Sequence, residues 1–115
     1  MFSRKNGVEN LMDLNVIRDR AYAGAKERGF WDYADIKEEK VRIGCRLALV
    51  HCEVSEAIEE LRKPDMDIYK FGEELIDVII RIGDIAAYYN IDLDSTMESK
   101  LNHNLTRPLR HNKDL

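Results

Sequence analysis

The sequence predicts an all-α fold, a four-helix antiparallel bundle that is completed by oligomerisation. Of the 115 residues, 44% are hydrophobic and 35% are charged, with only 6 Gly and 2 Pro, which is typical of helix-rich globular proteins. Apolar residues recur at steps of three and four along four segments. Short breaks separate these segments, as between neighbouring helices of a bundle. We expect one domain that spans residues 1–115, because this length supports one core.

The first helix is expected from Val8 to Arg28 and the second from a cap near Asp35 to Lys63. Apolar positions in the first follow helical spacing and comprise Leu14, Ile17, Ala21 and Ala25, and Gly29 ends it. A loop with an aromatic cluster, residues 30–34, follows. Asp35 with Glu38 then resembles a capping arrangement. The middle of the second helix is apolar around most of its circumference, as expected of a central helix buried on more than one side.

The third helix is expected from Asp67 to Tyr89, after a break at Pro64 and Asp65. Its core face holds large residues at helical spacing, Phe71, Leu75, Val78, Ile79, Ile82 and Ala86. Asn90 is predicted to end this helix. Residues 92–95 offer N-cap side chains for a fourth helix that ends near Pro108.

Charge and composition exclude several classes of function. The formal net charge is −4 and the basic residues are scattered, so binding to a nucleic-acid polymer is not expected. Residues 1–7 are polar and no following run is long enough for a signal sequence or membrane span. We therefore expect a cytoplasmic protein without a membrane partner. Cys45 and Cys52 are seven residues apart on one helix, too far for a disulfide, and are interpreted as small buried thiols. The His and Cys residues do not form a zinc cluster.

Acidic side chains interrupt the apolar second helix on one side. Glu53, Glu56 and Glu60 fall within a narrow stripe, with Ala48, Cys52 and Ser55 beside it. The third helix repeats this arrangement with Glu74 and Asp77. Such like charges repel unless a cation lies between them. Oxygen ligands of this kind suit Mg²⁺ or Mn²⁺. The alternative is that both stripes are ordinary solvated faces. A di-iron bundle is not indicated, because no Glu is followed by His three residues later.

These residues resemble a known family in their order and spacing. Glu53-x-x-Glu56 is followed after residues 57–73 by Glu74-x-x-Asp77. The apolar context from Leu47 to Lys63 and from Glu73 to Arg81 is similar, as is the downstream set Lys100, Asn104 and Arg107 before Pro108. The pattern resembles the MazG-like all-α nucleoside triphosphate pyrophosphohydrolases.

The resemblance implies Mg²⁺-dependent hydrolysis of a (deoxy)nucleoside triphosphate between the α and β phosphates. The products are the monophosphate and pyrophosphate, and the substrates include non-standard nucleotides. It implies that Glu53, Glu56, Glu74 and Asp77 hold the metal. Glu53 or Glu56 would act as general base, and the two remain equal candidates. A homodimer or homotetramer is implied as well, and the apolar second helix independently favours self-association.

Further residues are candidates for substrate binding. Lys100, Asn104 and Arg107 share one face of the fourth helix, which suits phosphate and base contacts, although a solvated basic face is the alternative. Trp31 and Tyr33 are candidates for stacking on a nucleobase, with core packing as the alternative. His51 is interpreted as a packing or interface residue and His103 as a weaker phosphate contact.

Two other functions remain open from the sequence. One is a non-catalytic helical dimerisation or adaptor module whose acidic stripes face solvent or a basic partner. The other is a nucleotide-binding protein without turnover.

Overall fold

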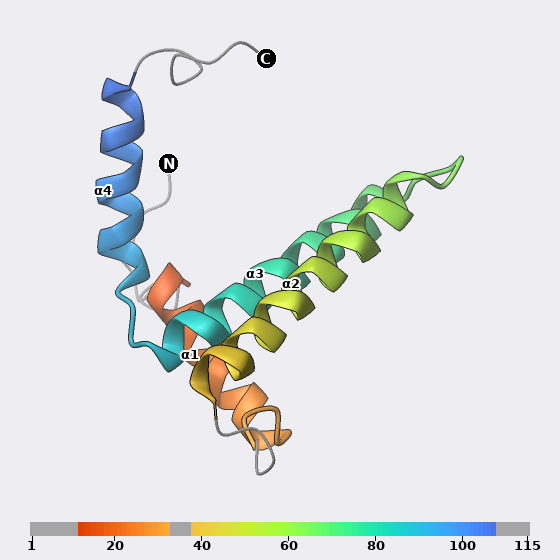
Figure 1. Ribbon diagram of the computed structural model, residues 1–115. Coiled ribbons are helices and arrows are strands. Elements are labelled where there is room, and N and C mark those ends of the chain that lie inside the picture. Colours follow the sequence, from red (N-terminus) through yellow and green to blue (C-terminus); the bar gives the residue numbers. More distant parts are fainter. Residues whose placement is uncertain (1–11, 33–37, 108–115) are drawn as a thin grey trace, which may run out of the picture.

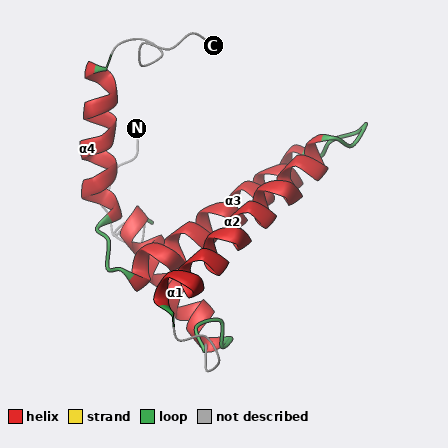
Figure 2. Ribbon diagram, in the orientation of Figure 1, coloured by secondary structure: helices red, strands yellow, loops and turns green. Residues whose placement is uncertain are grey.

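Four α-helices make up the part of the chain that the computed structural model describes, residues 12–32 and 38–107. They are α1 (Leu14–Glu27), α2 (Glu39–Leu61), α3 (Ile68–Tyr88) and α4 (Leu93–Thr106). These residues contain no strand, so the all-helical prediction is confirmed for them (Figures 1 and 2).

Aspartate side chains cap three of the four helix N-termini, and this decides where the helices begin. Asp13 accepts a hydrogen bond from the Val16 amide at 2.8 Å, which satisfies a donor that the first turn leaves unpaired. Asp67 and Asp92 cap α3 and α4 in the same way. The first helix was expected to include residues 12 and 13. That boundary is wrong, because Asp13 is extended and acts as the cap. Residues 8–11, and the expected cap at Asp35, lie outside the described residues.

The helix C-termini follow the predicted stop signals. Gly29, with φ of 77°, and Asn90, with φ of 53°, adopt left-handed backbone conformations just beyond α1 and α3. These two residue types tolerate that conformation best. At the end of α4, Arg107 is extended, as expected of a residue that precedes a proline.

The helices α2 and α3 form a long antiparallel hairpin, and the other two helices lie at its open end. Figure 1 shows α2 and α3 side by side, with the connecting turn at the tip. Helix α1 packs across α3 where Gly83 allows close approach, since a Cβ at this position would lie 3.3 Å from the Cα of Arg18. Helix α4 contacts α1 and extends away from the hairpin. The described chain therefore has the four expected helices, with α4 outside the α2–α3 pair.

Hydrogen bonds between α1 and the start of α4 set the direction of α4. Asn15 donates to Asp92 at 3.0 Å and accepts from the Leu93 amide at 2.8 Å. The Leu14 amide donates to Asp94 at 2.9 Å. The bond from Asn15, followed by that from the Ser95 amide, lowers the pKa of the Asp92 carboxyl. Helix α4 is thus fixed at its first turn, while the rest of it has no buried residue.

The buried core of the described chain is small. It comprises Ala25, Ile43, Ala57 and Ala86. Half of the expected core face of the third helix is exposed in the single chain, with Leu75, Ile79 and Ile82 each more than 40% accessible, whereas Ala86 is buried. The central α2 likewise leaves Leu47 and Ile58 about half exposed. The reason is that α4 points away, so no described helix covers these faces.

Two further expectations concern the cysteines and the membrane. Cys45 and Cys52 do not form a disulfide with each other, as expected from their spacing. Both side chains are exposed. Their expected burial is wrong, because one face of α2 has no neighbour within the described chain. None of the described helices combines the length and apolar character needed to cross a bilayer.

Candidate active site

The register of the α2–α3 hairpin brings the two acidic motifs to the same level. Near the open end, Arg42 donates to the Tyr88 hydroxyl at 2.8 Å and Arg46 forms an ion pair with Asp84. Both helices rise by about 1.5 Å per residue. Seven residues closer to the tip, Glu53 and Asp77 are therefore at one level, and three residues further Glu56 is level with Glu74.

Three carboxylates from the two helices converge in the middle of the hairpin. Glu53 on α2 and Glu74 and Asp77 on α3 each offer one oxygen, and these oxygens lie within 4.8 Å of one another. Mg²⁺ binds oxygen ligands at about 2.1 Å, so neighbouring ligand oxygens around it are about 3 Å apart, and the three side chains would move inward to bind it. The residue types and their spacing therefore fit a small divalent cation.

The other two glutamates of the α2 stripe lie at the edge of this group. Glu56 is exposed and is not part of the three-oxygen cluster. Glu60 is buried and accepts a bond from Lys63 at 2.9 Å. Lys63 therefore offsets the charge of Glu60. The structure thus places three of the four predicted metal ligands together and leaves Glu56 beside them.

Electrostatic repulsion within the cluster acts on Glu74. Partial burial raises the pKa of the Glu74 carboxyl, and the negative charges of Asp77, Glu56, Glu53 and Glu60 raise it further. A bound divalent cation would remove this repulsion, because it stabilises the ionised form of each ligand. The raised pKa of Glu74 thus reflects partial burial and the crowding of negative charge between the two helices.

Arg81 compensates one of these charges. Its Nε donates to Glu53 Oε2 at 2.9 Å, and both side chains are mostly buried, with 26% and 18% of their surface exposed. The guanidinium also lies over the ring of Phe30, 5.6 Å from its centroid. Arg81 is one turn beyond Asp77 on the same side of α3, so it connects the acidic cluster to the loop after α1.

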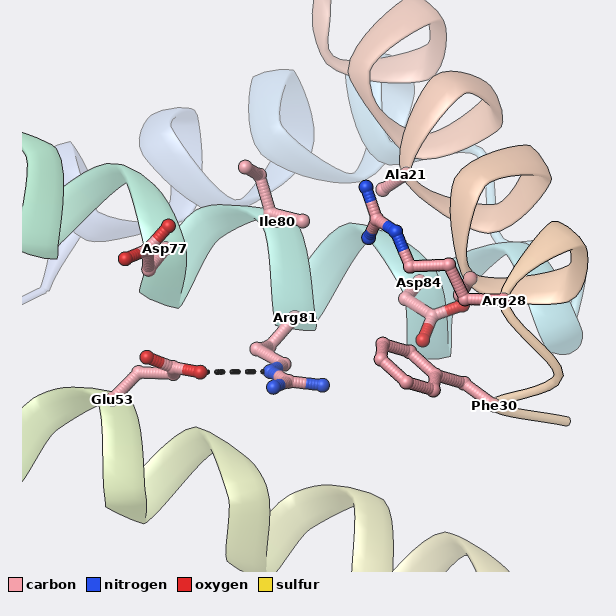
Figure 3. A pocket seen from close by; sticks show the side chains of 9 residues that line it. Ala21, Arg28, Phe30, Glu53, Asp77, Ile80, Arg81 and Asp84 are labelled. Carbon is pink, nitrogen blue, oxygen red and sulfur yellow. Dashed lines mark hydrogen bonds and ion pairs between the residues drawn. The ribbon is translucent and has the colours of Figure 1, made fainter.

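A pocket of about 310 Å³ opens beside the cluster. This volume is at the lower end of the range for small-molecule sites. Helix α1 contributes two small residues, Ala21 and Ala25, and the remaining lining residues are Arg28, Phe30, Glu53, Asp77, Ile80, Arg81 and Asp84. In the view of Figure 3, Glu53 and Asp77 lie at one end, and Arg28 and Phe30 lie at the other.

Trp31 lies in an aromatic and cationic cluster at the base of the hairpin. Its ring stacks on Tyr88 with centroids 4.7 Å apart and planes at 2°. The guanidinium of Arg46 lies over the indole at 4.7 Å, and the indole N–H donates to Asp84 at 2.6 Å. These contacts correspond to the packing alternative for Trp31. Tyr33 lies outside the described residues.

The predicted phosphate-binding set is located on a different arm of the chain. Lys100 and Asn104 lie on α4 and Arg107 directly follows it, and α4 extends away from the α2–α3 hairpin (Figure 1). Arg107 donates to Asn104 at 3.3 Å, so these two are neighbours. His103 is exposed on the same helix, and His51 is exposed on α2. Within one described chain these residues are not brought to the acidic cluster.

Sequence reasoning missed Arg28, Phe30 and Arg81 as lining residues of the pocket. Arg81 carried a usable signal, because it follows Asp77 by four residues and so shares its face of α3. No sequence pattern indicates that Arg28 and Phe30 line the pocket, because their position depends on how α1 crosses α3.

Scans against protein-family models, curated proteins and solved structures found no match for this chain.

Proposed function

We propose that the protein hydrolyses a (deoxy)nucleoside triphosphate to the monophosphate and pyrophosphate in a Mg²⁺-dependent reaction, with non-standard nucleotides among its substrates. The observation that carries this proposal is the convergence of Glu53, Glu74 and Asp77 within 4.8 Å, next to a pocket that contains arginines. The MazG-like spacing of the two acidic motifs, described above from the sequence, supports the same reaction.

The three convergent carboxylates are the proposed ligands of Mg²⁺ or Mn²⁺. When bound, the cation would neutralise phosphate charge and polarise the phosphoryl oxygens. Hydrolysis joins the oxygen of water to the α-phosphorus and breaks the bond from the α-phosphorus to the oxygen that bridges to the β-phosphorus. Glu56 is exposed beside the other three carboxylates, so it is the one available to accept the proton of water. We therefore assign it as the general base and leave Glu53 as a metal ligand.

Oligomerisation is part of this proposal for two reasons. The first is the apolar surface that α2 and α3 leave exposed, which is typical of an interface between subunits. The second is the separation of Lys100, Asn104 and Arg107 from the acidic cluster of their own chain. In a homodimer or homotetramer that completes the antiparallel bundle, α4 of one copy would bring these residues to the cluster of another. Trp31 would support the substrate indirectly, through the loop that carries Phe30.

The test is pyrophosphate release from a panel of normal and modified nucleoside triphosphates with Mg²⁺. We expect turnover of at least one nucleotide, and its loss with EDTA. Asp77→Asn removes one metal-binding charge, and Glu56→Gln removes the proposed base. Each substitution is expected to lower the rate by at least about a hundredfold, the lower range for general acid–base catalysis.

A matched control for these substitutions is Glu59→Gln. Glu59 lies on the same helix, is exposed and pairs with Arg62 outside the cluster, so its replacement should leave the rate unchanged. Turnover that persists undiminished in Asp77→Asn and Glu56→Gln would contradict the proposal, provided that circular dichroism shows the helices intact.

The exposed apolar surface also supports a second candidate function, a non-catalytic dimerisation or adaptor module. This function predicts self-association without any Mg²⁺-dependent rise in melting temperature. A third possibility is a protein that binds nucleotide without turnover. Added nucleotide would then raise its melting temperature but no pyrophosphate would be released, which distinguishes it from the hydrolase and from the adaptor module.

A further inference from the structure

The pocket beside the acidic cluster contains two guanidinium groups from different elements. Arg28 comes from the C-terminal end of α1, and Arg81 comes from the middle of α3. Arg46 also approaches from α2, but it is buried and forms its ion pair with Asp84. Arg28 has an exposed side chain, and no ion pair between it and another described residue lies within 4.0 Å. The pocket therefore holds one cation available to a ligand and a second in an exchangeable ion pair.

The ion pair of Arg81 would change when a metal binds to the cluster. Glu53 is bonded to Arg81 and is also one of the three convergent carboxylates. A cation that uses the same carboxylate competes with the guanidinium for its oxygens. Arg81 would then be free to bind an anion in the pocket, and the metal and the two arginines would together favour a group with several negative charges.

The chemistry of the lining favours a phosphate group over a nucleobase. Phe30 and Ile80 are its larger apolar residues, and the indole of Trp31 is already stacked on Tyr88. Guanidinium groups suit phosphate oxygens because they form paired, charge-assisted hydrogen bonds. The other apolar residues among those that line the pocket of about 310 Å³ are Ala21 and Ala25, so Phe30 is the one aromatic ring of this lining on which a base could stack.

We propose that this pocket binds the pyrophosphate portion of a nucleoside triphosphate, with Arg28 and Arg81 as its cationic ligands. The inference rests on the proposed function and adds the orientation of the substrate, with the leaving group toward α1. When the α-phosphorus bond breaks, the bridging oxygen keeps the electron pair and leaves as part of pyrophosphate. The two guanidinium groups lie where they would stabilise that additional negative charge.

The test measures binding of inorganic pyrophosphate by calorimetry with Mg²⁺ present, in wild-type protein, Arg28→Met and Arg81→Met. Each substitution removes charge-assisted hydrogen bonds, so the affinity should fall by roughly tenfold or more. Arg20→Met is the matched control, because Arg20 is exposed on the same α1 helix and does not line this pocket. Arg20→Met should bind pyrophosphate with the same affinity as the wild-type protein. A nucleoside monophosphate, which lacks the β and γ phosphates, should bind equally to all four proteins.

A second measurement separates ligand binding by Arg81 from a purely structural role. With Mg²⁺ alone, Arg81→Met should bind the metal more tightly than wild type, because Glu53 loses its competing partner. The same variant should bind pyrophosphate more weakly. A structural defect would weaken both.

The outcomes distinguish this inference from the proposed function. Arginine-dependent pyrophosphate binding without turnover of any nucleotide would support the pocket and count against the hydrolase. Turnover together with wild-type pyrophosphate affinity in Arg28→Met and Arg81→Met would overturn the pocket assignment and leave the hydrolase intact. Because Arg28 is exposed, Arg28→Met should fold normally. This variant therefore tests the pocket assignment even if Arg81→Met does not fold.

Discussion

Arg46 on α2 and Asp84 on α3 form an ion pair that is almost completely buried at the base of the hairpin, with 4% of each side chain exposed. The second oxygen of Asp84 accepts from the indole of Trp31, and Arg46 donates to the Phe30 carbonyl at 3.1 Å. The pair therefore joins α2, α3 and the loop after α1. Because that loop carries Phe30, the pair also shapes one end of the pocket.

Replacing Asp84 with Asn should destabilise the protein strongly. The guanidinium of Arg46 would remain buried without its counter-charge, at a cost of about 3–5 kcal/mol in the free energy of unfolding. Urea unfolding, followed by circular dichroism and by the fluorescence of Trp31, measures this. Arg62→Met breaks the exposed pair with Glu59 and should cost at most about 1 kcal/mol. Equal losses in the two variants would contradict the structural role assigned to Asp84.

The raised pKa of Glu74 predicts how stability depends on pH in the metal-free protein. The folded state binds this proton more tightly than the unfolded state, so protonation favours folding. The free energy of unfolding of wild type should therefore increase relative to Glu74→Gln as the pH falls from 7 toward the ordinary pKa of glutamate. The relative gain is lost as the pH rises through the raised pKa. Parallel pH profiles of the two proteins in EDTA, measured by urea unfolding, would contradict the repulsion within the cluster.

The exposed apolar residues of the hairpin should form a subunit interface. On α2, Leu47 and Ile58 belong to one helical stripe, and on α3 Leu75 and Ile79 form part of another. Leu47→Glu with Ile79→Glu should weaken self-association by more than about tenfold, since burying one such side chain contributes about 1.5–3 kcal/mol. Sedimentation equilibrium measures the shift toward the monomer.

Val41→Glu is the control for the interface prediction. Val41 is half exposed on α2 but is rotated away from the stripe of Leu47 and Ile58. It should leave the molecular mass in solution unchanged. A wild-type protein that is monomeric at high micromolar concentration would exclude the interface.

Mixing two inactive variants should restore activity if α4 acts on a second copy. Asp77→Asn lacks a metal ligand, and the double variant Lys100→Met with Arg107→Met lacks the basic face of α4. In a mixed two-fold dimer, one site would combine an intact cluster with an intact α4. Random pairing would then return about a quarter of the wild-type rate. Pyrophosphate release before and after co-refolding measures this, and no recovery would place the basic residues outside the site.

Much of the local structure could be predicted from the sequence because the signals are themselves local. Gly29, Asn90 and Asp92 specify helix ends through backbone conformation or a side-chain cap, and each does so in the structure. Asp13 also does so, but the apolar pattern that continued into residues 8–12 concealed it. The acidic stripes could be placed on helix faces by periodicity alone, and the break at Pro64 predicted the turn between the two helices.

The arrangement between helices could not be predicted in the same way. The direction of α4 depends on the bonds from Asn15 to Asp92 and Leu93, which connect positions far apart in the sequence. The exposure of Cys45 and Cys52 follows from that direction, because no described helix covers their face. The pairing of Arg46 with Asp84, and the pocket that Arg28 enters, likewise depend on long-range contacts that periodicity does not specify.

Binding of Mn²⁺, followed by electron paramagnetic resonance and displaced by Mg²⁺, tests the central claim most directly. The claim is that Glu53, Glu74 and Asp77 hold one divalent cation between α2 and α3. Wild type and Glu59→Gln should bind Mn²⁺ with equal affinity, whereas Glu74→Gln and Asp77→Asn should each bind it at least about tenfold more weakly, because each loses a charged oxygen ligand. Equal binding in all four proteins, or no binding in any, would contradict it.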